Sequence, residues 1–328
     1  MAEKVDEKEE PLVSEAHSSL FHYTTETGLY GILESQELWA THFAYLNDSQ
    51  EIIAAKGAIE AALYESIYQV AKDLVEKEKL DLKGKLTVED ICSGESVRFV
   101  DALYKATLKY VTPYIFSFCS HGESNREFHD GLLSQWRGYG SDGGFAIEFD
   151  SKEIEEQMHD DGLTCSHSGF HVSSVVYGTD SREFDDLKGR LDAIASVAGQ
   201  MMPRLFGLEG EEPAIDSTYL PFVQCITRMK NPGFREEGEV RLVYIRPEDS
   251  TVPVEKPDGK EIGFRAGPGV RTPYVQIFKN VDKKLPIARI VVGPHPKAEL
   301  RGTTLKLFLS QNGIDAEVVL SSLPYLPE

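Results

Sequence analysis

The chain has few cysteines and no long apolar run. Its 328 residues contain four cysteines, Cys92, Cys119, Cys165 and Cys225, and no C-x-x-C pair. So few cysteines in this length are not typical of a disulfide-stabilised secreted domain, and we expect reduced thiols. No apolar stretch reaches the roughly 18 residues that a membrane span needs, and the acidic start MAEKVDEKEEP lacks the basic and apolar regions of a secretory signal. These absences predict a soluble cytoplasmic protein without a membrane partner.

Positive charge is also scarce. The 34 Lys and Arg residues stand against 54 Asp and Glu residues, which gives a formal net charge of −20. A nonspecific nucleic-acid binder needs a surplus of Lys and Arg on at least one face, so this balance argues against that class. Apolar residues still make up 41 % and aromatic residues 10 %, which is enough for a packed core.

Two common catalytic and nucleotide-binding signatures are missing. The chain has no G-x-x-x-x-G-K phosphate loop and no G-x-S-x-G nucleophile elbow. A nucleotide or an acyl substrate would therefore need another kind of site.

Helical patterns dominate the first third of the chain, and strand patterns increase towards its end. Strands and helices do not alternate regularly, so we expect an α+β fold with a mixed or antiparallel sheet rather than a doubly wound one. The predicted organisation is a disordered acidic tail over residues 1–18 and one domain over 19–328, with a helical insertion at about 52–110. Strands are expected at 19–24, 38–41, 114–120, 143–149, 170–177, 239–245, 272–278, 287–292 and 316–320.

The first candidate site residues end the first predicted strand. His22 could hold a ribose hydroxyl or a phosphate while Tyr23 stacks on a flat ring. The alternative is a hydrogen-bonded, half-buried pair beside a helix cap, because histidine is also used structurally.

The second candidate is the run Glu237-Gly238-Glu239-Val240-Arg241. Residues two apart in a strand share a face, so Glu237, Glu239 and Arg241 should project together while Val240 faces a core. Two carboxylates beside a guanidinium form either a solvated ion-pair row or the edge of an active site.

The third candidate is Gln135-Trp136-Arg137-Gly138-Tyr139. Clustered aromatic, Arg and Gly residues suit a wall on which a ring stacks, although a core aromatic before a glycine turn is the alternative.

Two further patterns have simpler explanations. Cys119-x-His121 and Cys165-x-His167, with His171 nearby, have spacings that zinc could use, but we expect no metal. Asp48 with Glu51 is a capping-box pattern that opens a long helix, so capping explains these acids without a ligand.

In their order along the chain, these motifs resemble the bacterial domain of unknown function 2971 family. The resemblance rests on FHYTTETGLYGILESQELWATHFAYLND, SFCS, LLSQWRGYG with GGFAIEF, MKNPGFREEGEVRLVY, IVVGP and a terminal S-x-x-P-Y. It covers about residues 20–326. The helical stretch at about 52–110 is longer than the minimal family pattern, and Tyr325-Leu326-Pro327 ends the chain where a basic residue is expected.

A more distant resemblance is to the ADP-ribosyltransferase fold, which has a His or Arg on its first core strand and a Glu, often in E-x-E, on a late strand. The resemblance implies that His22 holds the adenosine-side ribose and that Ser117 supports the pocket. It implies that Glu239 is catalytic, with Glu237 as the outer acid. Trp136 or Tyr139 would stack on nicotinamide or adenine, and Arg137 or Arg241 would meet the pyrophosphate.

The function implied is ADP-ribosyl transfer from, or cleavage of, NAD as substrate, in a toxin or phage-defence setting, with a protein or nucleic acid as one type of acceptor. The alternative is a non-catalytic module of the same fold that senses a nucleotide. Cleavage of the bond between nicotinamide and ribose in NAD passes through an oxocarbenium-like state that a carboxylate stabilises. The predicted acids therefore suit the enzymatic function chemically.

Overall fold

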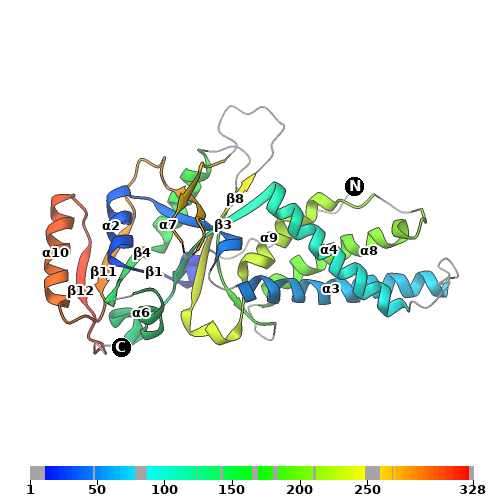
Figure 1. Cartoon of the computed structure of the whole chain (residues 1–328), viewed down its shortest axis with the longest axis horizontal. Coiled ribbons are helices and arrows are strands. Elements are labelled where there is room, and N and C mark those ends of the chain that lie inside the picture. The colour runs from blue at the N-terminus through cyan, green and yellow to red at the C-terminus, as the bar shows by residue number, and fades with distance from the viewer. Residues whose placement is uncertain are drawn as a thin grey trace.

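The computed structural model describes residues 12–46, 49–77, 87–123, 125–140, 143–164, 169–179, 184–209, 212–247, 259–267 and 269–324. A large sheet with flanking helices joins a group of long helices, which lies to the right in Figure 1. Among the described helices, none is long and apolar enough to cross a membrane.

Ten of the described strands form one mixed sheet. Its main path runs β12-β11-β4-β1-β3-β2-β10-β9, and β8 joins β3 and β5 off this path. All neighbouring pairs are antiparallel except β11–β12, which agrees with the expected α+β class and mixed sheet. The bounds are β1 Ser19–Thr24, β2 Leu38–His42, β3 Val111–Cys119, β4 Phe145–Asp150, β5 Gly169–Ser174, β8 Glu239–Pro247, β9 Ile262–Arg265, β10 Thr272–Ile277, β11 Ile287–Val292 and β12 Glu317–Leu320. A separate parallel pair is formed by β6 (Val176–Tyr177) and β7 (Met229–Lys230).

Two strands, β1 and β2, pair with the same edge of β3, so the sheet divides along this edge. Along its other edge β3 pairs with β8 over its whole length, from Val111 to Cys119. On the shared edge β2 pairs with Tyr114 and Ile115, whereas β1 pairs only at Cys119. We call the interval between β1 and β2 the sheet split.

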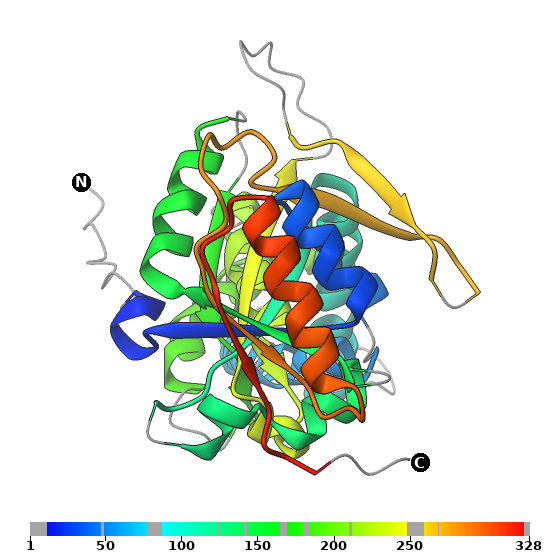
Figure 2. The same ribbon diagram turned by 90° about the vertical axis from the view of Figure 1, so that its left-hand side faces the viewer.

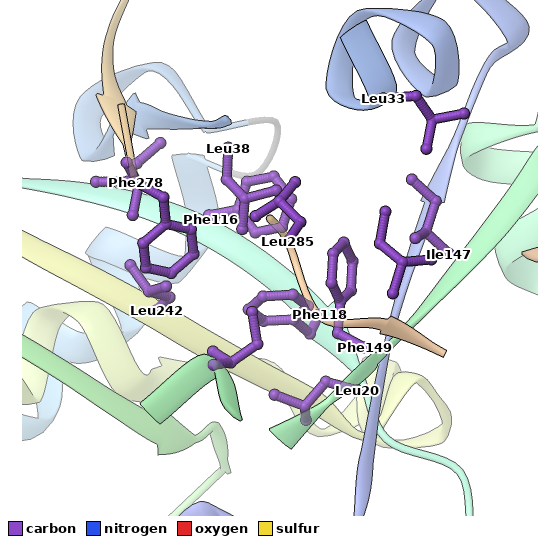
Figure 3. Packing of buried hydrophobic residues seen from close by; sticks show 14 of the residues in the cluster. Leu20, Leu33, Leu38, Phe116, Phe118, Ile147, Phe149, Leu242, Phe278 and Leu285 are labelled. Carbon is purple, nitrogen blue, oxygen red and sulfur yellow. The ribbon is translucent and has the colours of Figure 1, made fainter. Parts of the chain in front are cut away.

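The first core fills one face of the sheet. Large side chains of the strands, among them Leu20, Phe118 and Phe149, pack together there (Figure 3). The helices α2 (Glu26–Ser35), α7 (Ser151–Gly162) and α10 (Ala298–Gln311) contribute to this core. Figure 2 shows α2 and α10 side by side, and the rings of Tyr30 and Phe308 meet edge to face between them, 4.8 Å apart.

The other face carries two smaller cores. The helical core joins Ile115 and Val243 of the sheet to α3 (Ser49–Glu76), α4 (Val88–Tyr110), α8 (Asp185–Leu205) and α9 (Tyr219–Arg228). The aromatic core joins Phe21, Tyr23 and Cys119 to Trp136, near α5 (Arg126–Asp130) and α6 (Leu133–Tyr139). The predicted helical stretch at 52–110 therefore packs with α8 and α9, which come much later in the chain. The remaining short helices are α1 (Val13–Ala16), η1 (Phe43–Tyr45), η4 (Ile215–Thr218) and η5 (Pro232–Glu237).

The expected disordered tail needs a correction at its end. Residues 1–11 lie outside the described residues, but residues 12–18 are ordered and include α1. Val13 is buried, and its backbone N–H donates to the Glu155 carboxylate of α7 at 2.7 Å. The Ser14 hydroxyl also donates to Glu155, at 2.5 Å. The ordered chain thus begins before Ser19 because α1 is held on α7.

Candidate functional site

Five charged side chains from four elements meet on the face of the sheet that carries the helical core. We call them the charge cluster: Glu51 in the first turn of α3, Lys230 in β7, Glu237 at the end of η5, and Glu239 and Arg241 at the start of β8. Each acid contacts at least one of the two cations. The sequence places three of these residues together, and folding adds the other two.

Arg241 binds two acids of the cluster at once. Its Nε donates to Glu239 Oε1 at 2.8 Å, and its Nη2 donates to Glu51 Oε2 at 2.6 Å. Its Nη1 donates to the backbone carbonyl of Thr227 at 2.8 Å. A planar guanidinium with fixed donor directions therefore ties β8 to α3 and α9.

Lys230 bridges all three acids. Its Nζ lies 2.7 Å from Glu237 Oε2, 2.8 Å from Glu239 Oε2 and 3.3 Å from Glu51 Oε1. The ammonium also lies 5.0 Å from the centre of the Phe234 ring. Three carboxylates around one lysine and one arginine leave the cluster with a formal charge of −1.

A tight turn brings Glu237 and Glu239 to the same lysine. We expected both acids in one strand, but Glu237 ends η5 and β8 begins at Glu239. Gly238 between them has a φ of 50°, and a Cβ there would lie 2.7 Å from the Ser120 carbonyl oxygen. The left-handed turn and the close approach both require glycine, and they replace the strand alternation on which the prediction rested.

The charge cluster is buried, and Glu239 stays ionised. Burial alone would raise the pKa of Glu239, but Arg241 and then Lys230 outweigh it and lower the pKa to about 2. Burial opposes the charge on Lys230 as well, yet Glu239, Glu237 and Glu51 raise its pKa. Of the three acids Glu237 is the outermost, with 14 % of its side chain exposed against 6 % for Glu239. A ligand would therefore meet Glu237 first.

Ser117 lies beside the cluster. It is directly opposite Arg241 in the β3–β8 pairing, and Ser173 of β5 is opposite Arg241 on the other side. Paired residues share a face, so both serines face the same way as Arg241. Ser117 is half-buried, whereas the Ser173 hydroxyl is buried and has no hydrogen-bond partner among the described residues.

His22 lies on the opposite face of the sheet from Glu239. Phe21 pairs with Cys119, and Cys119 pairs with Glu239, so the neighbouring His22 points towards the first core. Its ring packs on Phe116 with centres 4.3 Å apart. Its Nδ1 donates to the Ser117 carbonyl at 3.0 Å across the sheet split, and burial lowers its pKa to about 4. The structure therefore separates His22 from the two predicted catalytic acids.

Tyr23 and Trp136 come together in the aromatic core. Their rings meet edge to face with centres 4.8 Å apart. The Tyr23 hydroxyl accepts from the Leu132 backbone N–H and lies 2.8 Å from His121 Nε2, while Trp136 Nε1 donates to the Asp130 carbonyl. Both rings are buried, so neither presents a free face for stacking.

Arg137 and Tyr139 are exposed at the end of α6. The glycines at 138, 140 and 143 have G-x-G-x-x-G spacing, but this segment follows a helix and precedes β4. A dinucleotide-binding loop follows a strand and opens a helix, so the spacing alone does not indicate one.

The predicted helix cap and the zinc-like spacing involve further residues. Glu51 belongs to the charge cluster, because its carboxylate contacts Arg241 and Lys230. Asp48, Cys165 and His167 lie outside the described residues. Within the residues that the structure describes, no group of three or more His, Cys, Asp or Glu side chains could hold a metal ion.

Two cavities lie away from the charge cluster. One of about 280 Å³ is lined by Thr164, Gly259, Lys260, Glu261, Gln276, Lys279 and Asn280. The other, of about 260 Å³, is lined by Met201, Arg204, Leu205, Glu212, Pro213 and Ile215.

Sequence reasoning missed Lys230 and the role of Glu51. Lys230 lies in the quoted motif MKNPGF, and the spacing from a lysine to a later E-x-E-x-R could have suggested a shared cation. Glu51 could not be linked to Arg241 from spacing, because 190 positions separate them.

Comparisons with known proteins identify one family. A family model described as "Protein of unknown function (DUF2971)" matches residues 135–242. No curated protein and no solved structure matches the chain. The matched segment contains Lys230, Glu237, Glu239 and Arg241, four of the five members of the charge cluster. The family expected from the sequence motifs is therefore confirmed over residues 135–242, where the chain matches the DUF2971 model.

Proposed function

We propose that the protein binds NAD at the outer side of the charge cluster and cleaves the bond between nicotinamide and ribose, as an ADP-ribosyltransferase or NAD glycohydrolase. The observation that carries the proposal is the pair of acids on Lys230. Glu239 is buried and its pKa is lowered to about 2, while the half-buried Glu237 lies above it, 2.7 Å from the same ammonium.

The chemistry needs negative charge next to the ribose. When the C1′–N bond breaks, nicotinamide leaves with the bonding electron pair and C1′ gains oxocarbenium character. Glu237 would accept a hydrogen bond from the ribose 2′-hydroxyl, and the ionised Glu239 beneath it would stabilise the developing positive charge. Water or an acceptor nucleophile then adds at C1′, and its proton passes to Glu237 or to solvent.

Other predicted residues would bind the rest of NAD. Ser117 lies on the same face as Arg241 and is half-buried. Arg137 could meet the pyrophosphate and Tyr139 could stack on a ring, because both are exposed on α6. Arg241 takes the role of a positioning residue, since its nitrogens already bind Glu51, Glu239 and Thr227.

The proposal gives His22 and Tyr23 smaller roles than the sequence resemblance implies. His22 faces the first core, and Tyr23 is enclosed in the aromatic core. An ADP-ribosyltransferase-like arrangement is supported by the adjacency of β3 and β8, which carry Ser117 and Glu239. Loss of cellular NAD or modification of a target would suit a toxin or a phage-defence effector.

The test is incubation of the purified protein with NAD, with nicotinamide release followed by mass spectrometry. We expect release by the unmodified protein and a loss of at least about 100-fold in Glu237→Gln, because a group that acts on the reacting atoms contributes roughly this much. Glu236→Gln is the matched control, since Glu236 is the exposed neighbour of Glu237. Equal rates in Glu237→Gln and Glu236→Gln, with both variants folded by circular dichroism, would contradict the proposal.

A second candidate function is a nucleotide sensor without turnover. One observation favours it: both carboxylate oxygens of Glu239 already accept hydrogen bonds from Arg241 or Lys230, and its side chain is 6 % exposed. A sensor should bind NAD saturably in calorimetry and release no nicotinamide. Product formation by the unmodified protein would exclude the sensor.

A further inference from the structure

An aromatic pair lies on the open part of the sheet, on β2 and β10. The rings of Trp39 and Tyr274 are stacked, with centres 4.2 Å apart and an interplanar angle of 16°. Trp39 is 39 % exposed, which is unusual for one of only two tryptophans in the chain. The other, Trp136, is 4 % exposed.

The backbone of β9 leaves room for the Tyr274 ring. Tyr274 is opposite Gly263 of β9, and a Cβ at Gly263 would lie 2.6 Å from Cζ of the Tyr274 ring. On its other side Tyr274 is opposite Thr41, which is two residues along β2 from Trp39 and so shares its face. We call Trp39 and Tyr274 the stacking platform.

The segment that carries Tyr274 is basic, although the chain as a whole is acidic. Residues 260–279 contain Lys260, Arg265, Arg271 and Lys279 against one acid, Glu261, so this segment has a formal charge of +3. The rest of the chain then has −20 − 3 = −23. Arg265 shares the face of Tyr274, and its Nη2 donates to Thr41 Oγ1 at 2.7 Å.

Tyr274 of the platform lies on a projecting hairpin, and Trp39 lies on the neighbouring strand β2. Figure 2 shows β9 and β10 extending away from the body of the molecule. Arg265, Arg271 and Lys279 are exposed, and Lys279 donates to Gln276 Oε1 at 2.9 Å. One acid, Glu37, lies near this surface. Its Oε2 accepts a hydrogen bond at 2.6 Å from Nε2 of Gln276, the residue opposite Trp39.

We propose that the stacking platform binds single-stranded nucleic acid. An exposed aromatic surface on strands, with arginines beside it, is the arrangement on which unpaired bases stack. The scarcity of positive charge argued against nucleic acids for the chain as a whole, but the Lys/Arg surplus that such binding requires is present on this hairpin. The surface could present a nucleic-acid acceptor to the proposed NAD reaction, but binding does not depend on that reaction.

Stacking should dominate over phosphate contacts. Three exposed cations release few counterions, so the slope of log affinity against log salt should not exceed about 2 for a single strand. The remaining charge of the chain repels phosphates elsewhere, which confines the strand to the hairpin. A duplex of the same sequence should bind much more weakly, because its bases are already stacked.

Intrinsic fluorescence provides the first measurement. Octathymidylate and octauridylate are titrated into the protein without NAD, and tryptophan emission is recorded. We expect saturable quenching from Trp39, while the buried Trp136 supplies a constant background. Trp39→Phe should remove most of the quenching, and the two oligonucleotides distinguish DNA from RNA as the preferred strand.

Variants at exposed aromatic residues on opposite faces of the sheet provide the matched control. Trp39→Ala should weaken binding of a fluorescein-labelled octanucleotide by at least about tenfold, as expected for loss of one base stack. Phe264→Ala should change it less than about twofold. Phe264 is 58 % exposed on the same hairpin but alternates to the opposite face from Tyr274.

Three results would overturn the proposal: no saturable binding at 100 µM of either oligonucleotide (about the weak end of nonspecific affinities), equal losses in Trp39→Ala and Phe264→Ala with both variants folded, or equal affinity for single strand and duplex. Because NAD is absent, a failure here leaves the proposed NAD cleavage untouched. A failure of nicotinamide release likewise leaves this binding test intact.

Discussion

Lys230 illustrates the cost of burying charge at the level of single residues. An ammonium that is 8 % exposed would be expelled from the protein interior unless its charge were compensated. Here three carboxylates compensate it, and Arg241 compensates two of these in turn. Each charged side chain of the cluster therefore depends on the others. Removal of one leaves its former partners charged and unpaired where water cannot solvate them.

Lys230→Met is predicted to destabilise the protein by about 3–5 kcal/mol, because it leaves buried carboxylates without their positive partner. Urea unfolding followed by circular dichroism measures this free energy. The control is Lys283→Met, which removes an ion pair of similar length, 2.7 Å to Asp160, between side chains that are 53 % and 42 % exposed. Exposed pairs contribute only about 0–1 kcal/mol, so similar losses in the two variants would contradict this view of the cluster.

At the scale of elements, capping determines where α4 begins. Within the predicted helical insertion at about 52–110, α4 begins at Val88. Thr87 Oγ1 accepts from the Asp90 N–H at 3.1 Å, and Asp90 Oδ2 accepts from the Thr87 N–H at 3.0 Å. This reciprocal capping box satisfies two backbone donors that the first turn would otherwise leave unpaired.

We predict that Thr87→Ala lowers the free energy of unfolding by about 1 kcal/mol, the usual loss on removal of a capping hydroxyl. Thr87→Ser keeps the hydroxyl and should differ from the unmodified protein by less than about half of this. The measurement is again chemical unfolding. The assignment of this capping box would be rejected if the serine variant lost as much as the alanine variant.

One element that periodicity does not predict is α7. Its sequence SKEIEEQMHDDG has few apolar residues, so the helical pattern is weak. A local signal was present, since Asp150 accepts from the Glu153 N–H at 2.9 Å as an N-cap. Strands with a strong pattern were found with the observed bounds, including β1 and β11.

For the molecule as a whole, several buried groups respond to acid in the same direction. Burial lowers the pKa of His22 and of His121 from 6.5 to about 4. Below pH 6.5 these two histidines bind protons in the unfolded chain but stay neutral in the folded chain. The free energy of unfolding therefore falls as the pH drops from 6.5 towards 4. The lowered pKa of Glu239 contributes stability above pH 4.5 that is lost as the pH falls towards 2.

The expected result is a continuous fall in stability below about pH 6.5, measured by urea unfolding at a series of pH values. His121→Gln should flatten the fall between pH 6.5 and 4 by about 1–3 kcal/mol, and Glu239→Gln should flatten the part below pH 4.5 by about 3 kcal/mol. A His159→Gln variant serves as control. A curve that is flat from pH 7 to pH 4 in the unmodified protein would contradict the prediction.

Most local structure and part of the candidate site can be predicted from the amino-acid sequence alone. A short run of β-prone residues predicts β1, and short spacing brings Glu237, Glu239 and Arg241 to one place even though a glycine turn replaces the expected strand. The ordered motifs also identified the family that the model of residues 135–242 confirms. These features depend on interactions among residues only a few positions apart.

Which distant residues share an environment depends on the three-dimensional packing of the chain. The register of β1, β3 and β8 places His22 on the face opposite Glu239, which no local pattern reveals. Packing of α3 against β8 brings Glu51 to Arg241 across 190 positions, and the pairing of β2 with β10 stacks Trp39 on Tyr274. Strand order and helix packing determine which buried charges and which aromatic rings come into contact. The burial of apolar surface over the whole chain in turn determines that order and packing.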